Sequence, residues 1–389
     1  MSDDALILTL NAGSSSLKFG LYEAVAEPVA ILAGTAELGE RAGVSVDGEE
    51  GAIALPSGDH ATAVEAVLRL AEERAGKRAV RAIGHRIVHG GEHFAEPTPL
   101  DAGAIERLRA LVPLAPLHQP HNLAGVEAAR AAHPEALQVG CFDTAFHRTQ
   151  PPEEDRYALP GALTDAGVRA YGFHGLSYAF IAGELERVAP AIACGRVVVA
   201  HLGNGASMCA MRGGRSLASS MGFSPLDGLV MGTRSGALDP AVPIYLMDRG
   251  MSAREIEALL YRRSGLLGVS GLSHDMRTLE AAAAEGHGGA ERAITLFAHR
   301  AKRMVGSLAA ALGGLDALVF TGGIGEHSAL VRARICDGLA WMGIALDGNA
   351  NAAHGPSIGR GGVRVLVVPT DEERVIARAA ARALGKVGQ

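Results

Sequence analysis

A strand-turn-strand pattern occurs twice in this chain, and it limits the available folds more than any other feature. Residues 7–22 read ILTLNAGSSSLKFGLY, and residues 196–211 read RVVVAHLGNGASMCAM. In each segment an apolar run enters a small polar turn that contains glycine, and a second apolar run follows. The recurrence, about 190 residues along the chain, predicts two similar halves. We place the domain boundary near residue 147.

Strands and helices alternate along the rest of the chain. The apolar runs typical of strands are 5–10, 17–22, 81–88, 137–142, 196–201, 207–211, 317–320 and 363–368. Helical periodicity covers 61–75 and 291–312. In the segment PTDEERVIARAAARAL we expect Thr370 to cap the final helix, with Glu373 completing a capping box. This alternation is typical of an α/β fold.

The glycine-rich turns indicate phosphate binding. Glycine permits close approach of the backbone, and the N–H groups of such turns can point at phosphate oxygens. The first turn matches neither G-x-x-x-x-G-K-[ST] nor G-x-G-x-x-G. A third glycine turn, LVFTGGIGEHS at 318–328, follows a strand and is expected against a nucleotide's sugar or base. Three such turns in one chain favour a nucleotide site more strongly than any one of them.

Charge and cysteine content narrow the class of protein. The net charge of −6 gives no basic field for nucleic acid or anionic lipid. The four cysteines lie far apart, which fits reduced thiols in a cytosolic protein. The opening segment MSDDALILTL has too short an apolar run for a signal peptide or a membrane span. We therefore expect a cytoplasmic protein with no nucleic-acid or membrane partner.

Nine polar motifs occur in the order found in one family. They are NAGSSSLKF, GHRIVHGGE, APLHQP, FDTAFH, YGFHG, HLGNG, MGTRSG, FTGGIGE and PTDEE. In this order the chain resembles the acetate kinases, members of the acetate and sugar kinase/Hsp70/actin superfamily, from residue 7 to about 380. The resemblance implies two similar duplicated α/β domains of the ribonuclease H-like type with a cleft between them. It places 1–147 plus 377–389 in the N-terminal domain and 148–376 in the C-terminal, nucleotide-binding domain.

The resemblance also implies the chemistry: reversible, Mg²⁺- or Mn²⁺-dependent, in-line transfer of a phosphoryl group from ATP to acetate. Phosphoryl transfer depends on positioning and charge neutralisation, and an arginine fork suits both carboxylate and phosphate. The implied catalytic residues are Arg86, His118, Asp143, His174 and Arg234. A carboxylic acid is already an anion at neutral pH, so we interpret Asp143 as a metal or positioning group. Asn11 and Glu372 are the implied metal residues.

The nucleotide residues that the resemblance implies lie in four segments. They are Ser14, Ser16 and Lys18; His201, Leu202, Gly203, Asn204 and Gly205; Asp275, Met276 and Arg277; and Gly322, Gly323, Ile324, Gly325 and Glu326. A self-capped turn for the serines, a solvated lysine at position 18 and a helix-dipole role for Glu372 are the structural alternatives. The family forms homodimers, and we expect the same here.

Specificity is expected from an apolar wall of Val88, Leu117, Phe173 and Pro225 around the methyl group of acetate. Because one methylene is worth only about 1–3 kcal/mol in such a pocket, a kinase for propionate or another short-chain acid is an alternative. A nucleotide-switched binding protein of the actin or Hsp70 kind is another, although it would not need Arg86, His174 and Arg234 together.

Two further sets of residues stand apart from the motifs. His85, His89 and His93 have the spacing of helical metal ligands, but Gly90 and Gly91 would break such a helix, which argues against zinc. Tyr178, Ala237 and His327 depart from the residues usual in the family. We expect these departures to change the hydrogen bonds that surround the main site residues, and not those residues themselves.

Overall fold

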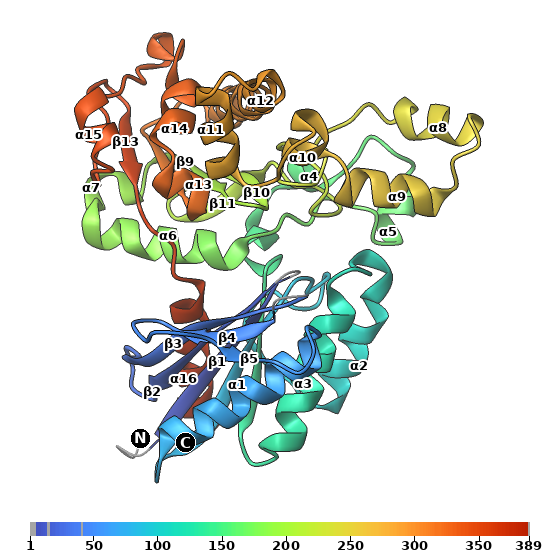
Figure 1. Cartoon of the computed structure of the whole chain (residues 1–389), viewed down its shortest axis with the longest axis vertical. Helices are drawn as coiled ribbons and strands as arrows, with labels where there is room; N and C mark the ends of the chain where they lie inside the picture. The colour runs from blue at the N-terminus through green and yellow to red at the C-terminus, as the bar shows by residue number, and fades with distance from the viewer. Residues whose placement is uncertain (1–4, 14–15, 40–41, 388–389) are drawn as a thin grey trace. The chain divides into compact units, whose positions relative to one another are not determined.

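The computed structural model describes residues 5–13, 16–39 and 42–387 (Figure 1). The chain divides into two compact units, residues 1–146 with 371–389 and residues 147–370. Each unit is built on its own sheet.

The sheet of the first unit has eight strands among the described residues, in the order β5-β4-β3-β2-β1-β6-β8-β7. The strands are β1 (Ala5–Ala12), β2 (Ser16–Glu23), β3 (Ala30–Glu37), β4 (Gly43–Val46), β5 (Ile53–Ala54), β6 (Ala79–Ile87), β7 (Thr98–Pro99) and β8 (Leu137–Phe142). β1 runs antiparallel to β2 but parallel to β6, which runs parallel to β8. The carboxyl ends of β1, β6 and β8 therefore share one edge, the usual place for ligands in such sheets.

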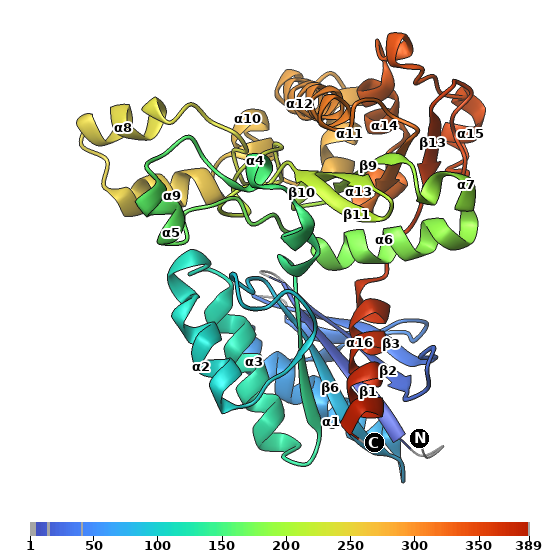
Figure 2. The same ribbon diagram turned by 180° about the vertical axis from the view of Figure 1, so that it is seen from behind.

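Helices cover both faces of this sheet. α1 (His60–Ala75) and α3 (Gln119–Ala132) pack on one face, and α16 (Glu372–Val387) packs on the other (Figures 1 and 2). α2 (Ala102–Ala110) packs beside α3. The apolar face predicted for 61–75 is buried, and the Asp59 carboxylate accepts the Thr62 N–H at the start of α1. α1 ends at Gly76, whose φ of 63° suits glycine.

The sheet of the second unit repeats the central order of the first. Within the described residues its strands follow the order β11-β10-β9-β12-β13, where the first sheet has β3-β2-β1-β6-β8. They are β9 (Arg196–Leu202), β10 (Ala206–Arg212), β11 (Arg215–Ser219), β12 (Ala317–Thr321) and β13 (Arg364–Val367). β9 is again antiparallel to its hairpin partner and parallel to the strand on its other side. The two predicted hairpins thus occupy equivalent places in two copies of one topology.

The second unit carries most of the helices. They are α4 (Pro152–Asp155), α5 (Gly161–Asp165), α6 (Gly175–Val188), α7 (Pro190–Ala193), α8 (Ala241–Asp248), α9 (Ala253–Arg262), α10 (Gly265–Ser270), α11 (Met276–Ala284), α12 (Gly288–Leu312), α13 (Gly322–His327), α14 (Ala329–Cys336) and α15 (Gly348–Ala352). α12 packs on β9, β10 and β11. The face predicted for this helix is Ile294, Phe297, Ala301, Met304, Val305 and Leu308, and all of these residues are buried except Met304, which is half-buried. α8 and α9, yellow in Figures 1 and 2, lie at one end of the unit. Single turns of 3-10 helix occur at Val112–Leu114, Ala145–Thr149 and Ala340–Met342.

The end of the chain differs from the prediction in two respects. Residues 371–376, expected in the C-terminal domain, lie in the first unit together with the rest of α16. The predicted capping box of Thr370 and Glu373 is wrong, because the helix begins one residue later than expected. The Asp371 carboxylate accepts the Arg374 N–H at 2.9 Å and takes the capping role.

No helix in the described part of the chain has the length and apolar character required to cross a membrane.

Candidate active site

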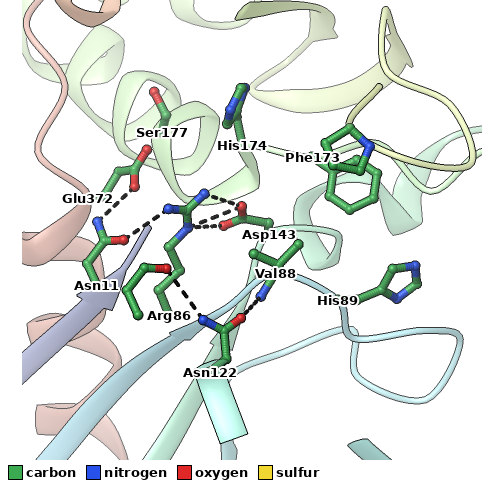
Figure 3. Close-up of polar contacts among 12 residues, drawn as sticks. Asn11, Arg86, Val88, His89, Asn122, Asp143, Phe173, His174, Ser177 and Glu372 are labelled. Carbon is green, nitrogen blue, oxygen red and sulfur yellow. Dashed lines mark hydrogen bonds and ion pairs between the residues drawn. The ribbon is translucent and has the colours of Figure 1, made fainter. Parts of the chain in front are cut away.

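In the first unit, an arginine and an aspartate meet at the carboxyl edge of the sheet. Arg86 lies near the end of β6, and Asp143 directly follows β8, the parallel neighbour of β6. Arg86 Nη2 donates to Asp143 Oδ2 at 2.7 Å, and Nε donates to Oδ1 at 3.0 Å (Figure 3). The Asp143 carboxylate is buried. Such a bidentate pair fixes the plane of the guanidinium.

The surroundings of Arg86 keep it charged. Burial by itself lowers the pKa of Arg86, but the nearby carboxylates of Asp143 and Glu372 and the hydrogen bonds to Asp143 outweigh it and raise the pKa. The side chain is 16% exposed. A permanently charged, oriented guanidinium therefore remains accessible from solvent at this edge.

Asn11 extends this cluster to β1 and α16. Its Oδ1 accepts a hydrogen bond from Arg86 Nη1 at 3.1 Å, and its Nδ2 donates to Glu372 Oε2 at 3.1 Å (Figure 3). Nδ2 also donates to Glu373 Oε1 at 2.9 Å. The amide thus joins the cation to two carboxylates. Of these, Glu373 had been predicted only as part of a helix cap. Its role was missed because the register between α16 and β1 cannot be read from local sequence.

The two glutamates form a place that suits a divalent cation. Burial raises the pKa of Glu373, and repulsion from the Glu372 carboxylate adds to the rise, which Lys18 and the Asn11 amide offset only in part. Bound positive charge would relieve that repulsion. The described residues contain no cluster of three or more His, Cys, Asp or Glu side chains suited to a metal. Mg²⁺ commonly takes one or two carboxylates and completes its shell with water and phosphate, so this donor set fits it.

A buried asparagine on α3 ties together the ends of β1 and β6. Asn122 Oδ1 accepts the Val88 N–H at 2.9 Å, and Nδ2 donates to the Ala12 carbonyl at 3.4 Å (Figure 3). Val88 itself is buried. Leu117 and His118 are half-buried just before α3, where His118 occupies the N-cap position. Asn122 was missed by sequence reasoning, because a helical asparagine carries no signal of its own.

The other first-unit residues that had been assigned to phosphate lie on the β1–β2 hairpin. Lys18 is exposed on β2, paired in register with Asn11. Ser16 is the half-buried first residue of β2. Ser14 lies outside the described residues.

In the second unit, two histidines stack at the start of α6. His174 has the N-cap position and a left-handed backbone, with φ 57° and ψ 26°, uncommon for a residue with a side chain. Its ring lies 4.4 Å from that of His201, near the end of β9. His174 Nδ1 contacts Ser207 Oγ at 2.8 Å, and His201 Nδ1 contacts Ser177 Oγ at 2.8 Å. Each imidazole therefore has one nitrogen held by a serine.

The HLGNG and MGTRSG motifs pack on each other. The Gly232 N–H donates to the Asn204 carbonyl at 2.9 Å, and a Cβ at position 232 would lie only 2.0 Å from Asn204 Oδ1. A side chain at position 232 would therefore force the Asn204 amide to move. In the second loop, Arg234 Nη1 donates to the Pro225 carbonyl at 3.1 Å. The predicted residues Asn204, Pro225 and Arg234 thus belong to one connected set of loops.

The GGIGE motif is helical, and the predicted turn is wrong here. Gly322–His327 forms α13, whose first residue has a φ of 76°. The Glu326 carboxylate accepts the N–H groups of Gly322 at 2.8 Å and Thr370 at 3.2 Å, so it holds the protein backbone together. Glycine followed by glycine argued for a turn, but Glu326 satisfies the first N–H and allows the helix to start.

The remaining predicted residues are distributed over both units. Asp275 caps α11 and pairs with Arg277, and Met276 is buried. Phe173 is buried, and its carbonyl contacts His147 Nε2 at 2.9 Å. The histidines weighed as zinc ligands include His85, which is buried against Gln138 Oε1 at 2.7 Å; burial lowers its pKa to about 4. All four cysteines are free.

A family comparison connects these features. Residues 6–378 match the model of the Acetokinase family. The chain belongs to this family. The acetate kinase of Rhodopseudomonas palustris (strain TIE-1) is 52% identical over 393 residues, which cover 97% of this chain and 98% of that protein.

Solved structures of this family have the same fold. The crystal structure of Porphyromonas gingivalis acetate kinase superposes with a TM-score of 0.88 at 39% identity, and covers 98% of this chain and 100% of that one. A propionate kinase from Francisella tularensis gives a TM-score of 0.90 at 38% identity, with 96% and 98% covered. The duplicated sugar kinase/Hsp70/actin-like fold expected from the sequence is therefore confirmed.

Proposed function

We propose that this protein is an acetate kinase, which transfers the γ-phosphoryl group of ATP to acetate and gives acetyl phosphate and ADP. The observation that carries the proposal is the oriented Arg86 guanidinium, held by Asp143 and Asn11 within an Acetokinase-family chain. A fixed, permanently charged fork suits a carboxylate acceptor and a transferring phosphoryl group. The reaction is reversible, because an acyl phosphate can return its phosphoryl group to ADP.

The residues of the chain would divide the work as follows. Arg86 and Arg234 bind the acetate carboxylate and neutralise the transferring phosphoryl group, while Asp143 holds the Arg86 plane. His118 and His174 donate to the phosphoryl oxygens. Acetate needs no base, because it is already ionised at neutral pH. Val88, Leu117, Phe173 and Pro225 form the wall against the methyl group.

The nucleotide would be bound by backbone and side-chain groups of both hairpins. The proposed residues are Ser14, Ser16, Lys18, the segments 201–205 and 275–277, and the segment 322–326. Asn11 and Glu372, with Glu373 beside them, would hold Mg²⁺ together with water and phosphate oxygens. The cation supplies charge neutralisation on the phosphates. We also propose a cytoplasmic location, where ATP is available.

A propionate kinase is the second candidate, because a protein of that name has a closely similar structure. Valine at position 88 favours the smaller acid, since it fills space that an added methylene would need. The preference would be modest, about tenfold, as expected for one methylene.

We further propose a homodimer that buries α8. This helix is largely apolar, yet Ile244, Tyr245 and Met247 are 57%, 58% and 47% exposed. Apolar surface of this extent on one short helix is typical of an interaction site. Light scattering during size-exclusion chromatography should give the mass of two chains. A double change of Ile244→Glu and Tyr245→Glu should give one chain, whereas Trp341→Glu, at a 79% exposed tryptophan, should not.

The proposed activity is tested by incubating the purified protein with ATP, Mg²⁺ and acetate, propionate, butyrate or no acid, with hydroxylamine to trap acyl phosphate. We expect the hydroxamate of acetate to form fastest, with propionate about tenfold slower. Equal ATP consumption in the absence of any acid would contradict the proposal. Faster reaction with propionate would favour the second candidate.

A further inference from the structure

We propose that Tyr178, acting through Ser207, holds His174 as the neutral tautomer that carries its proton on Nε2. Tyr178 and Ser207 would thus be positioning residues for the histidine. The inference rests on the proposed function for its catalytic consequence, but the tautomer itself is a property of the free protein.

The three side chains form a line inside the second unit. Tyr178 lies in the first turn of α6, and His174 occupies the N-cap position of the same helix. Ser207 lies opposite, near the start of β10. Its Oγ contacts Tyr178 Oη in a short hydrogen bond and His174 Nδ1 at 2.8 Å. Tyr178 and Ser207 are fully buried.

The proposed order of donors runs from Tyr178 through Ser207 to His174. A phenol and a serine hydroxyl each have one proton to donate, and a neutral imidazole has one donor and one acceptor nitrogen. When Tyr178 donates to Ser207, the serine proton is free to point at Nδ1. Nδ1 then accepts, and the ring proton is on Nε2. This order uses each hydroxyl proton in one hydrogen bond.

The surroundings favour a protonated tyrosine. Burial raises the pKa of Tyr178 well above its ordinary value, and the neighbouring Cys209 adds to the rise. Burial also raises the pKa of the Cys209 thiol to about 12, so it is neutral. Two further titratable neighbours are His147, whose ring meets Tyr178 edge-on, and His201, stacked on His174.

His147 provides an internal precedent. Its Nε2 lies 2.9 Å from the Phe173 carbonyl, which can only accept, so Nε2 carries a proton. Its Nδ1 lies 2.9 Å from Ser216 Oγ. In the neutral ring Nδ1 then accepts, and the donors beside it are the Ser216 hydroxyl and, at 3.5 Å, the Gln150 amide. The same unit therefore already contains a serine beside a histidine whose proton is on Nε2.

In this tautomer the proton on Nε2 faces the HLGNG turn, where it can serve as a hydrogen-bond donor. A Cβ at Gly205 would lie 3.2 Å from His174 Nε2, so this nitrogen faces the HLGNG turn assigned to phosphate. An Nε2–H there can donate to a phosphoryl oxygen without the ring becoming charged. Because the pKa of Tyr178 is raised above its ordinary value, its hydroxyl stays protonated at neutral pH and would keep the donor in place.

The test is the imidazole ¹⁵N spectrum of the full-length protein with labelled histidine, with His174 assigned from its absence in His174→Gln. Wild type should show the Nε2–H pattern at neutral pH. In Tyr178→Phe, Ser207 can accept as well as donate, so a mixture of tautomers is expected. Ser207→Ala removes the partner of Nδ1 and should also give a mixture. Ser220→Ala is the matched control, since Ser220 is a buried serine that contacts Met208 N in the same sheet.

Kinetics give a second readout. Loss of the oriented donor in Tyr178→Phe should lower kcat about three- to tenfold, the usual worth of one hydrogen bond, with both KM values unchanged. An Nδ1–H pattern in wild type, or an unchanged Nε2–H pattern and kcat in Tyr178→Phe, would overturn the inference. Should Tyr178→Phe fail to fold, Ser207→Ala decides by the same criteria. A wild-type Nε2–H pattern that Tyr178→Phe disturbs, in a protein that phosphorylates no acid, would sustain the tautomer and refute the proposed function.

Discussion

The two units share the order of their central strands, but they carry different kinds of side chain at the ends of those strands. Asn11 is the next-to-last residue of β1 and pairs with Lys18 across its hairpin, whereas His201 is the next-to-last residue of β9 and pairs with Ser207. The first position leads into a charged cluster with Arg86 and Glu372. The second position belongs to a neutral cluster in which His174 and His201 form hydrogen bonds with serine hydroxyls. A duplicated fold therefore supplies equivalent positions, and the residues at those positions determine what each copy can bind.

This contrast has an energetic consequence. A buried ion pair is costly to break, because the remaining charge has no partner. A hydroxyl–imidazole contact can be lost at the usual cost of one hydrogen bond, about 1 kcal/mol. Substitutions in the charged cluster should therefore lower stability and activity together, whereas substitutions among the neutral contacts should lower activity with a stability loss of only about 1 kcal/mol.

The largest effect is expected for Arg86→Met. It leaves the buried Asp143 carboxylate without its partner, so the free energy of unfolding should fall by about 3–5 kcal/mol, and acyl-phosphate formation should become undetectable. Urea unfolding and the hydroxamate assay measure the two effects. Adding Asp143→Leu should restore much of the stability but none of the activity. A single variant as stable as wild type would show that the pair does not have the predicted energetic role.

A smaller effect is expected for Asn122→Ala. It removes hydrogen bonds to Val88 and Ala12, so the acetate wall should loosen and the KM for acetate should rise several-fold, with a stability loss of about 1–2 kcal/mol. Gln138→Ala is the control, because it removes a buried amide that contacts His85 in the same sheet. An equal rise in the KM for acetate in both variants would assign the effect to general loosening.

Val88→Ala should change specificity with little effect on turnover. Removing two methyl groups leaves room for a longer acid, so kcat/KM for propionate relative to acetate should rise about tenfold. Val64→Ala, at a buried valine on α1, should lower stability without changing that ratio. An unchanged ratio in Val88→Ala would place the methyl group of acetate elsewhere.

The smallest effect concerns pH. The pKa of Glu373 is raised in the folded protein, so folding binds a proton and stability falls as pH rises from about the ordinary value of 4.5 through the raised value. Glu373→Gln should therefore flatten the loss of stability between pH 4.5 and 7.5 in metal-free buffer. Urea midpoints across this range measure it. A steeper pH dependence in the variant would contradict a raised pKa of Glu373 in the folded protein.

The sequence predicted the parts that depend on local pattern. The eight strand segments expected from apolar runs all correspond to strands, and 61–75 corresponds to α1. β3, β4, β5, β7 and β11 were not predicted, because several are short or lie at sheet edges where apolar content is low. The start of α16 was misplaced by one residue, since both Thr370 and Asp371 are good N-cap residues.

The sequence predicted the site residues that lie within recognisable motifs. It did not predict the hydrogen bonds that those residues make with segments far away in the sequence. Arg86 and Asp143 were expected as separate site residues, but their ion pair depends on the parallel register of β6 and β8. Glu373 accepts a hydrogen bond from Asn11, and Asn122 accepts one from the Val88 N–H; each pair is far apart in sequence. No local pattern specifies such contacts, because they arise only when helices pack on the sheet.

The most direct test of the proposed division of labour is a steady-state comparison of Arg86→Lys in the first unit with Ser207→Ala in the second. Lysine keeps the charge but loses the bidentate geometry, so Arg86→Lys should raise the KM for acetate at least tenfold and lower kcat. Ser207→Ala should lower kcat about three- to tenfold and leave the KM for acetate unchanged. A KM for acetate that rises equally in both variants would contradict the assignment of acetate binding to Arg86 and of a phosphoryl-oxygen donor to His174.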